Sequence, residues 1–248
     1  MIIIQTNTIK RPIIIAHRGA SNIAPENSLK AFQKAIDLKA DYIEFDVRQT
    51  RDGEIVIIHD RHTSRTTGQS GKVKNFNLSE LKKLDCGEGE SIPTLQELVN
   101  LAKGKINLNC EIKVRGIAEK VVKILNDSDF IDKTIISSFK HDILIKIHKL
   151  ESQIKLASLE PTRIKWVKGW LSRKSLLNVA IKNHFYAVKP FYRLVNQNLI
   201  AKTHKNNIKI IPWTVDSESE IKRLINLGID GIITNEIQKV KNVLNEIN

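Results

Sequence analysis

The stretch YIEFDVRQTRDGEIVIIHD, residues 42–60, decides how the chain folds. Two apolar, β-branched runs flank the turn-forming residues 51–53, a pattern typical of two strands joined by a tight turn. Side chains alternate along a strand, so Glu44 and Asp46 point the same way. Two adjacent carboxylates in an apolar strand repel each other and are costly to bury. A divalent cation would remove that cost.

Strand-like and helix-like segments alternate on both sides of this stretch. This alternation favours βα units with parallel pairing, and eight such strands favour an α/β fold of the (β/α)8 TIM-barrel type over an open sheet. No GxGxxG or GxxxxGK[ST] motif is present. The predicted parallel strands are residues 13–16, the first strand of 42–60, 106–112, 134–137, 154–159, 185–188, 208–212 and 231–234, with 55–58 as a hairpin partner.

The domain organisation follows from length and local composition. A chain of 248 residues suits one α/β barrel, so we expect a single domain over residues 1–248. Residues 60–92 are richer in Gly, Ser, Thr and Asn and predict a short insertion after the second strand. The two cysteines form no disulfide framework or zinc spacing, and the apolar runs at the N-terminus are too short for a signal peptide. We therefore expect a cytoplasmic protein.

The net charge of +13 is concentrated in one part of the chain. Residues 151–210 carry 12 basic and 2 acidic side chains, which favours an electrostatic field over one surface. Within this part, residues 163–177 (RIKWVKGWLSRKSLL) have the pattern of a basic helix with tryptophan. Such a helix either makes peripheral contact with a membrane or is an ordinary helix of the barrel. Most amphipathic helices face a core, which favours the second interpretation. A non-enzymatic alternative is a binder of anionic surfaces or nucleic acid. No nucleic-acid module is recognisable, so we expect no nucleic-acid partner.

Polar residues close several predicted strands, whose C-terminal ends converge on one mouth of a barrel. Glu44, Asp46 and Glu111 form an oxygen-only ligand set, which predicts one divalent cation, Mg²⁺ or Ca²⁺, with Mn²⁺ as a further candidate. The alternative is that these acids pair with arginine and lysine. His17 and His59 have the chemistry of a general acid and base.

Three cationic residues also lie at predicted strand ends. Arg18 and Lys113 supply positive charge for a phosphate. Lys189 ends another predicted strand, and we expect it either to contact the substrate or to form part of the basic surface.

Motifs over nearly the whole chain resemble the glycerophosphodiester phosphodiesterase family. The most specific are HRGASNIAPENS (17–28) and DYIEFDVRQTRDGEIVIIHD (41–60). Further matches are RTTGQSGKV (65–73), LKKLDCGEGESIPTLQELV (81–99), EIK (111–113), SSF (137–139), PWTVD (212–216) and GIDGIITN (228–235). The resemblance implies a barrel with a short insertion after the second strand, and metal-dependent hydrolysis of small glycerophosphodiesters to sn-glycerol 3-phosphate and an alcohol. A lysophospholipase D activity on lipid substrates is the enzymatic alternative.

Carried over by position, the resemblance also implies residue roles. The catalytic pair is His17 and His59, the metal ligands are Glu44, Asp46 and Glu111, and the phosphate is held by Arg18 and Lys113; Glu26 and Asn27 support or line the site, and Phe139 and Trp213 shape its glycerol end. The family pattern T-D-x-P is replaced here by TNEI at residues 234–237. We expect this departure to affect the start of the last helix rather than the catalytic set. Head group, preferred cation, oligomeric state and the division of roles between the two histidines stay open.

Overall fold

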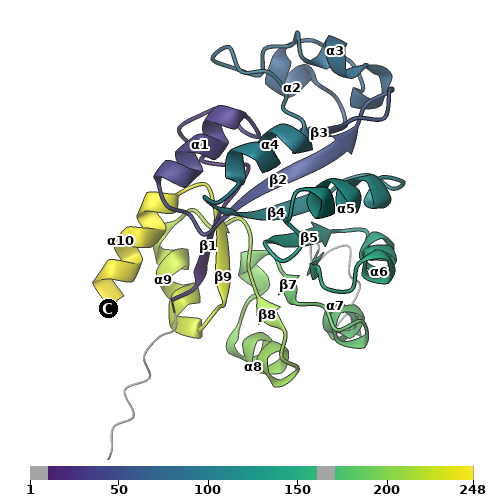
Figure 1. Ribbon diagram of the computed structural model, residues 1–248. Helices are drawn as coiled ribbons and strands as arrows, with labels where there is room; N and C mark the ends of the chain where they lie inside the picture. The colour runs from purple at the N-terminus through teal and green to yellow at the C-terminus, as the bar shows by residue number, and fades with distance from the viewer. Residues whose placement is uncertain (1–10, 161–170, 248) are drawn as a thin grey trace, which may run out of the picture.

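A parallel barrel organises the computed structural model, which describes residues 11–160 and 171–247. The strands of the barrel lie in the order β8-β7-β6-β5-β4-β2-β1-β9 (Figure 1). They are β1 (Ile13–Ala16), β2 (Tyr42–Gln49), β4 (Asn107–Ile112), β5 (Thr134–Ser138), β6 (Lys155–Leu159), β7 (Ala187–Lys189), β8 (Lys209–Ile210) and β9 (Gly231–Thr234). The TIM-barrel prediction is confirmed. β8 is shorter than predicted: the amides of Ile211 and Trp213 still donate to the carbonyls of Val188 and Pro190, but Pro190 has no N–H group to donate back to β8.

Backbone hydrogen bonds join the two ends of this strand order. The amide of Asp230 donates to the carbonyl of Ile210 (3.0 Å), and the amide of Ile233 donates to the carbonyl of Pro212 (3.0 Å). The amide of Val215 in turn donates to the carbonyl of Ile233 (2.9 Å). These bonds bring β9 beside β8, so the C-terminal ends of all the parallel strands converge on one mouth.

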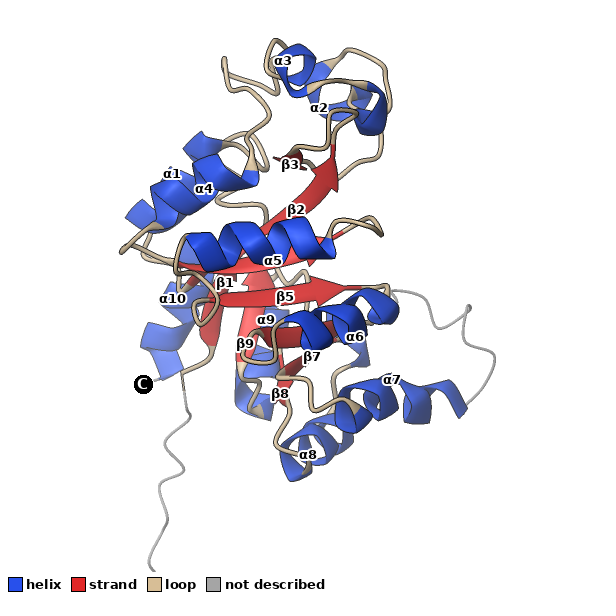
Figure 2. Cartoon of the chain, turned by 45° about the vertical axis from the view of Figure 1, so that its right-hand side comes forward, coloured by secondary structure: helices blue, strands red, loops and turns tan. Residues whose placement is uncertain are grey.

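Helices form the outer layer of the barrel, as Figure 2 shows. They are α1 (Leu29–Asp37), α4 (Leu95–Ala102), α5 (Ala118–Asp127), α6 (His141–Leu150), α7 (Leu171–Lys182), α8 (Gln197–Lys205), α9 (Glu218–Leu227) and α10 (Ile237–Ile247). Their starts follow the capping rules. The hydroxyl of Ser28 accepts from the amide of Ala31 (3.1 Å), and Thr94 and Glu97 form a capping box at α4.

Apolar side chains fill two separate spaces. The larger cluster lies between strands and helices and contains residues such as Phe45, Leu108 and Val240. A smaller cluster inside the barrel comprises Ile15, Tyr42, Ile135, Ala157, Ala187, Ile211 and Ile233. Side chains alternate along each strand. A residue two positions after a member of this smaller cluster therefore points to the same side of its strand and lies at the mouth of the barrel. There the apolar interior gives way to polar groups.

The insertion after the second strand begins with the hairpin partner β3 (Ile55–Ile57), which pairs antiparallel with β2. It continues through α2 (Ser64–Thr67), the 3-10 turn η1 (Val73–Asn75) and α3 (Leu78–Leu81). These elements group beyond the end of β2 (top of Figure 1). A small core of its own supports the segment, formed by Val56, Ile58, Val73, Leu81, Leu84 and Ile92. The antiparallel return of β3 brings His59 to the mouth.

The basic segment 163–177 falls mostly outside the described residues, which resume at Leu171. Leu177 at its end packs into the core with 1% of its surface exposed. Among the helices in the described ranges, none has the length and apolar character needed to cross a membrane.

Candidate active site

The mouth of the barrel contains a cavity of about 160 Å³. A cavity of this volume admits a small polar molecule. Its walls combine three classes of side chain: charged, neutral polar and apolar. The lining residues are His17, Arg18, Glu44, His59, Asn109, Glu111, Lys113, Ser137, Phe139, Leu159, Trp213 and Ile233. Most of the predicted site residues therefore meet in one cavity.

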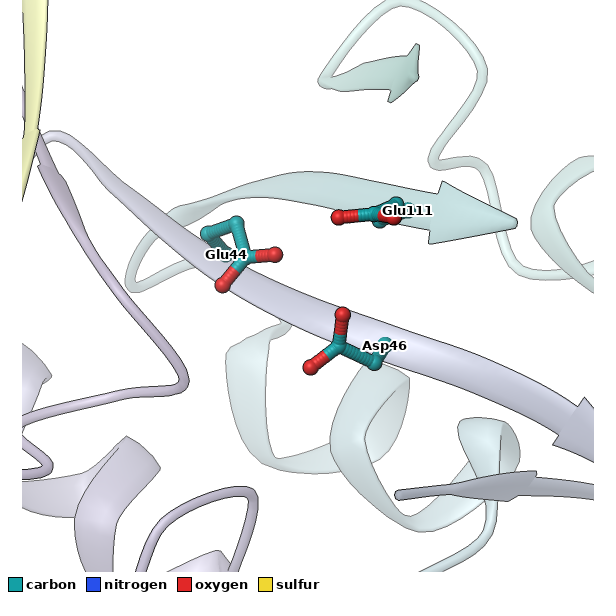
Figure 3. A group of neighbouring side chains, drawn as sticks. All are labelled: Glu44, Asp46 and Glu111. Carbon is teal, nitrogen blue, oxygen red and sulfur yellow. The ribbon is translucent and has the colours of Figure 1, made fainter. Parts of the chain in front are cut away.

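Glu44, Asp46 and Glu111 form a carboxylate cluster between β2 and β4 (Figure 3). Glu44 and Asp46 lie on one face of β2, and Glu111 lies opposite Asp46 in the parallel register. One oxygen from each residue lies within 4.8 Å of the others, and all three side chains are buried. Burial and the neighbouring charge of Asp46 raise the pKa of Glu44, because like charges in a dry site resist ionisation together.

The carboxylate cluster fits a divalent cation by the chemistry of its donors. Three buried carboxylate oxygens that can reach one point are the ligands that Mg²⁺ and Ca²⁺ prefer. The alternative of ion pairing is present as well. The ammonium of Lys113 lies 2.9 Å from Asp46 Oδ1 and 2.6 Å from Glu111 Oε1. Arg18 Nε also lies 3.5 Å from Asp46 Oδ2. Among the described residues Glu44 forms no ion pair, so ion pairing accounts for only two of the three carboxylates.

Arg18 and its neighbour Gly19 hold the loop after β1 against the carboxylate cluster. The amide of Arg18 donates to Glu44 Oε2 (2.9 Å), and its guanidinium Nε lies 3.5 Å from Asp46 Oδ2. The backbone at Arg18 is left-handed, with φ of +55°. Gly19 is also left-handed, and a Cβ there would lie 2.7 Å from the backbone carbonyl carbon of Ala31. Only glycine fits this close approach without strain.

The predicted supporting residues Glu26 and Asn27 are not among the residues that line the cavity. The amide of Asn27 donates from Nδ2 to Asp46 Oδ2 (2.9 Å), which fixes the orientation of that carboxylate. Glu26 accepts from Arg18 (3.0 Å) and from Arg65 Nη2 (2.6 Å). Both residues therefore position charged side chains of the site.

His17 is held by an amide. Asn235 Nδ2 donates to Asp216 Oδ2 (2.7 Å), which leaves Asn235 Oδ1 as an acceptor for His17 Nδ1–H (2.8 Å). The proton of a neutral His17 is thus placed on Nδ1, and Nε2 keeps its lone pair. Burial and the charge of Arg18 lower the pKa of this histidine, and the hydrogen bond to Asn235 opposes them.

The expectation that the departure at residues 234–237 spares the catalytic set is wrong. The substituted position, Asn235, contacts His17 directly, because β9 pairs with β1 and both strands end at the mouth. Sequence reasoning missed Asn235 because 218 positions separate the two residues. The signal available was that Asn235 itself follows a strand end, as the predicted site residues do.

His59 is held by a carboxylate instead. Its Nδ1 lies 2.6 Å from Asp60 Oδ1, and Asp60 Oδ2 accepts from Arg65 Nε (2.5 Å). Burial lowers the pKa of His59, whereas the charges of Asp46 and Asp60 oppose this effect. Arg65 and His59 hold the pKa of Asp60 at about 2, although burial opposes them, so this partner stays negatively charged.

Phe139 and Trp213 form an apolar wall of the cavity. Their rings meet edge to face, with centroids 5.5 Å apart, and Phe191 contacts the other side of Trp213 at 6.0 Å. Trp213 Nε1 donates to the carbonyl of Lys189 (2.8 Å), which fixes its ring. Phe139 is 45% exposed, so this wall continues towards solvent.

Lys189 belongs to the barrel interior, so its assignment to the basic surface is wrong, whereas a substrate contact stays a prediction. It is fully buried, donates to Asn109 Oδ1 and lies outside the cavity lining. The alternation along β7 explains this position, because Ala187, two residues earlier, also faces the interior. Burial lowers the pKa of Lys189 to about 7, while the charges of Glu44 and Glu111 oppose this. The negative charges of Glu44 and Glu111 thus favour the protonated form of an amine whose protonation burial disfavours.

Comparison with known proteins places the chain in one family. The glycerophosphoryl diester phosphodiesterase family matches residues 17–239. A glycerophosphodiester phosphodiesterase of Caldanaerobacter subterraneus subsp. tengcongensis is 38% identical, over 94% of this chain and 98% of that protein. A lysophospholipase D of Rattus norvegicus is 26% identical, over 94% of this chain and 86% of that protein.

A solved structure of a phosphodiesterase has a similar fold. The Oleispira antarctica phosphodiesterase, in complex with the product sn-glycerol-3-phosphate, has a TM-score of 0.82 and 27% identity. The match covers 94% of this chain and 97% of that chain. The resemblance first drawn from the motifs is thereby confirmed: the chain belongs to the glycerophosphoryl diester phosphodiesterase family and is an enzyme of its phosphodiesterase class.

Proposed function

We propose that the cavity hydrolyses glycerophosphodiesters to sn-glycerol 3-phosphate and an alcohol, with His17 and His59 as general base and general acid. The single observation that carries this proposal is that both histidines line one small cavity with the buried carboxylate cluster. A family match over residues 17–239 supports the substrate class.

One divalent cation, Mg²⁺ or Ca²⁺, would be held by Glu44, Asp46 and Glu111. When bound, it supplies positive charge that draws a phosphodiester oxygen into the cavity and stabilises charge in the transition state. Arg18 and Lys113 line the same cavity and bind the remaining phosphate oxygens. Phe139 and Trp213 give the carbon skeleton of the glycerol an apolar wall to lie against.

The hydrogen-bond partners of the histidines divide the two roles. Asn235 is neutral and keeps the proton of His17 on Nδ1, which leaves Nε2 free to accept a proton. Asp60 is a carboxylate and stabilises the protonated form of His59. We therefore assign His17 as the base and His59 as the acid.

The reaction proceeds by balanced proton transfer. His17 Nε2 takes a proton from the nucleophile, which is either the neighbouring glycerol hydroxyl or a water molecule. The bond between phosphorus and the alcohol oxygen breaks, and His59 donates its proton to that oxygen. With the glycerol hydroxyl as nucleophile, a cyclic phosphate forms first, and the same two histidines in exchanged roles add water to it.

The deciding experiment measures hydrolysis of glycerophosphocholine in Mg²⁺, in Ca²⁺ and in chelator, with release of sn-glycerol 3-phosphate as the readout. We expect turnover with a divalent cation and its loss in chelator. A matched control is Glu54→Gln, which alters an exposed carboxylate paired with Lys120 outside the cavity and should leave turnover intact. Full activity in chelator would contradict the proposed role of the carboxylate cluster.

A second candidate is hydrolysis of lysophospholipids, favoured by the apolar wall of Phe139 and Trp213 that continues towards solvent. The rat relative that is named a lysophospholipase D also supports this candidate. Lysophosphatidylcholine tested beside glycerophosphocholine separates the two. Faster cleavage of the lipid, reduced by Phe139→Ser, would favour this candidate, whereas cleavage of glycerophosphocholine alone would remove it.

A further inference from the structure

The wall of the cavity contains a buried amide whose donor group has no partner. Asn109 lies on β4, lines the cavity and has none of its surface exposed to solvent. Its side-chain nitrogen Nδ2 has no hydrogen-bond partner among the described residues. A buried donor without an acceptor costs free energy, and a substrate oxygen beside it would remove that cost. Asn109 is therefore a candidate for direct contact with the substrate.

Lys189 fixes which atom of this amide is free. The side-chain nitrogen of Lys189 donates to Asn109 Oδ1, and Lys189 is itself fully buried in the barrel interior. An ammonium group has donors and no acceptor, so the amide cannot turn its NH2 group towards the lysine. Oδ1 therefore faces Lys189, which does not line the cavity, and Nδ2 lies on the other side of the amide.

The position of Asn109 along β4 places it below the groups assigned to the phosphate. Asn109 precedes Glu111 by two residues, so both side chains point into the barrel and Asn109 lies further from the mouth. Arg18 follows β1 and Lys113 follows β4, so both lie beyond the ends of their strands. The amide therefore faces the part of the substrate that extends deepest below the phosphate.

The surroundings of Asn109 suit a hydroxyl group. Glu44 lies opposite Asn109 in the parallel register of β2 and β4, and it lines the same cavity. A hydroxyl can accept a hydrogen bond from the amide and donate one to a carboxylate oxygen. An anionic oxygen can only accept, and the carboxylate repels it. A neutral donor beside a carboxylate is therefore matched to an alcohol rather than to a phosphate.

The glycerol part of the substrate offers this hydroxyl under the proposed function, on which this inference rests. The leaving alcohol must reach solvent, so the glycerol occupies the closed end of the cavity. Its C2 hydroxyl adjoins the phosphate ester, and its C1 hydroxyl is the group furthest from phosphorus. Trp213, against which the carbon skeleton lies, donates from Nε1 to the carbonyl of Lys189. Lys189 thus contacts both the apolar wall and the Asn109 amide.

We propose that Asn109 determines specificity by donating a hydrogen bond from Nδ2 to the C1 hydroxyl of the glycerol, and that Lys189 is the residue that positions its amide. Asn109 lies opposite Ile135 of the packed apolar cluster inside the barrel. An acyl chain attached to the C1 oxygen would therefore collide with the floor of the cavity. The preferred substrates are glycerophosphodiesters without acyl groups rather than 1-acyl lysophospholipids.

The test compares glycerophosphocholine with its 1-deoxy analogue, in which a methyl group replaces the terminal CH2OH group of the glycerol. Release of choline gives kcat/KM for both substrates, and the analogue keeps the C2 hydroxyl that is a candidate nucleophile. We expect the wild type to favour glycerophosphocholine by roughly ten- to a hundredfold, because the analogue leaves the buried donor unpaired.

Two variants test the residues that carry this preference. Asn109→Asp removes the donor and keeps an oxygen for Lys189, so the preference should fall to nearly one. An effect of the added charge on cation binding acts on both substrates and cancels in their ratio. Lys189→Met lets the amide turn and should reduce the preference several-fold. The matched control Asn107→Asp adds the same charge to the same face of β4, outside the cavity lining, and should leave the preference unchanged.

The outcomes separate this proposal from the one beneath it. If neither substrate is cleaved, the proposed function fails and this inference fails with it. If the wild type cleaves both with equal kcat/KM, or if the preference survives Asn109→Asp, the role of Asn109 is overturned and the hydrolase assignment stands. An equal loss on both substrates in Lys189→Met would overturn the positioning role of Lys189.

A third substrate tests the closed floor and needs only the wild type, so it does not depend on the folding of any variant. We expect a 1-acyl lysophosphatidylcholine to be cleaved more slowly than glycerophosphocholine. Cleavage of the lipid at an equal or higher kcat/KM would overturn the proposed contact at the C1 hydroxyl.

Discussion

The two histidines of the cavity have opposite kinds of partner. His17 is held by the neutral amide of Asn235, which Asp216 orients, whereas His59 is held by the carboxylate of Asp60, which Arg65 orients. Both arrangements fix a ring through Nδ1 and leave Nε2 for the substrate. The difference lies in charge: the carboxylate stabilises an imidazolium, and the amide stabilises a neutral ring with a defined tautomer. One type of side chain thereby obtains two proton-transfer roles.

Removal of the imidazole of His17 or of His59 should have the largest effect on turnover. His17→Ala and His59→Ala should each lower turnover of glycerophosphocholine by about 10²–10⁴-fold, because each loses one proton-transfer group. A diester with p-nitrophenol as its alcohol separates the roles, since this leaving group needs no protonation. We expect His59→Ala to regain most of its activity with that substrate and His17→Ala to regain none.

Steady-state rates for the four combinations of variant and substrate check this prediction. Equal losses on both substrates for both variants would contradict the division of roles. His148→Ala changes an exposed histidine on α6 that does not line the cavity, and it provides the control.

Giving each histidine the other's kind of partner, in two separate variants, should move the pH profiles of kcat/KM in opposite directions. Asn235→Asp places a carboxylate against His17 and raises its pKa, so the base is deprotonated only at higher pH. The acid limb of kcat/KM should therefore move up by about one pH unit. Asp60→Asn removes the charge beside His59 and lowers its pKa, so the acid loses its proton earlier. The alkaline limb should move down by a similar amount.

The pH dependence of kcat/KM in the two variants tests these shifts. If Asn235→Asp moves the alkaline limb instead, the assignments of acid and base are reversed. If neither variant moves a limb while kcat falls, the partners hold geometry alone.

The two partners also differ in how far the sequence could predict them. Asp60 adjoins His59 in the motif that first identified the site, so it lay within reach of local reading, although the sequence analysis assigned it no role; the structure shows the contact. Asn235 is joined to His17 only by the pairing of the last strand with the first. The pattern of strands and helices predicted that closure, because βα alternation fixes topology. It could not predict which side chains meet across the closure, since that depends on register.

Lys189 illustrates the same limit. Its position on a strand was predictable, and the alternation with Ala187 places it inward. The reason a lysine is tolerated there is the negative charge of Glu44 and Glu111, contributed by two other strands. Periodicity along one segment carries no information about that charge. The sequence-based expectations were thus accurate for the elements and for the convergence of most predicted site residues on one cavity, and failed where a partner comes from a distant strand.

The smallest effect is expected for a variant of Asp216. This variant tests whether Asp216 influences His17 through its charge or by orienting the Asn235 amide. Its carboxylate accepts from Asn235 Nδ2 and from the backbone amide of Asn235, and its charge raises the pKa of His17. In Asp216→Asn that charge is lost, so the pKa of His17 falls and the acid limb of kcat/KM moves to lower pH.

This direction is opposite to that of Asn235→Asp, and the shift should be smaller because Asp216 reaches His17 only through the intervening amide. Loss of the fixed acceptor also lets the Asn235 amide turn, which should lower kcat several-fold. A pH profile of Asp216→Asn that moves in the same direction as that of Asn235→Asp would show that orientation of the amide, rather than charge, sets the proton affinity of His17.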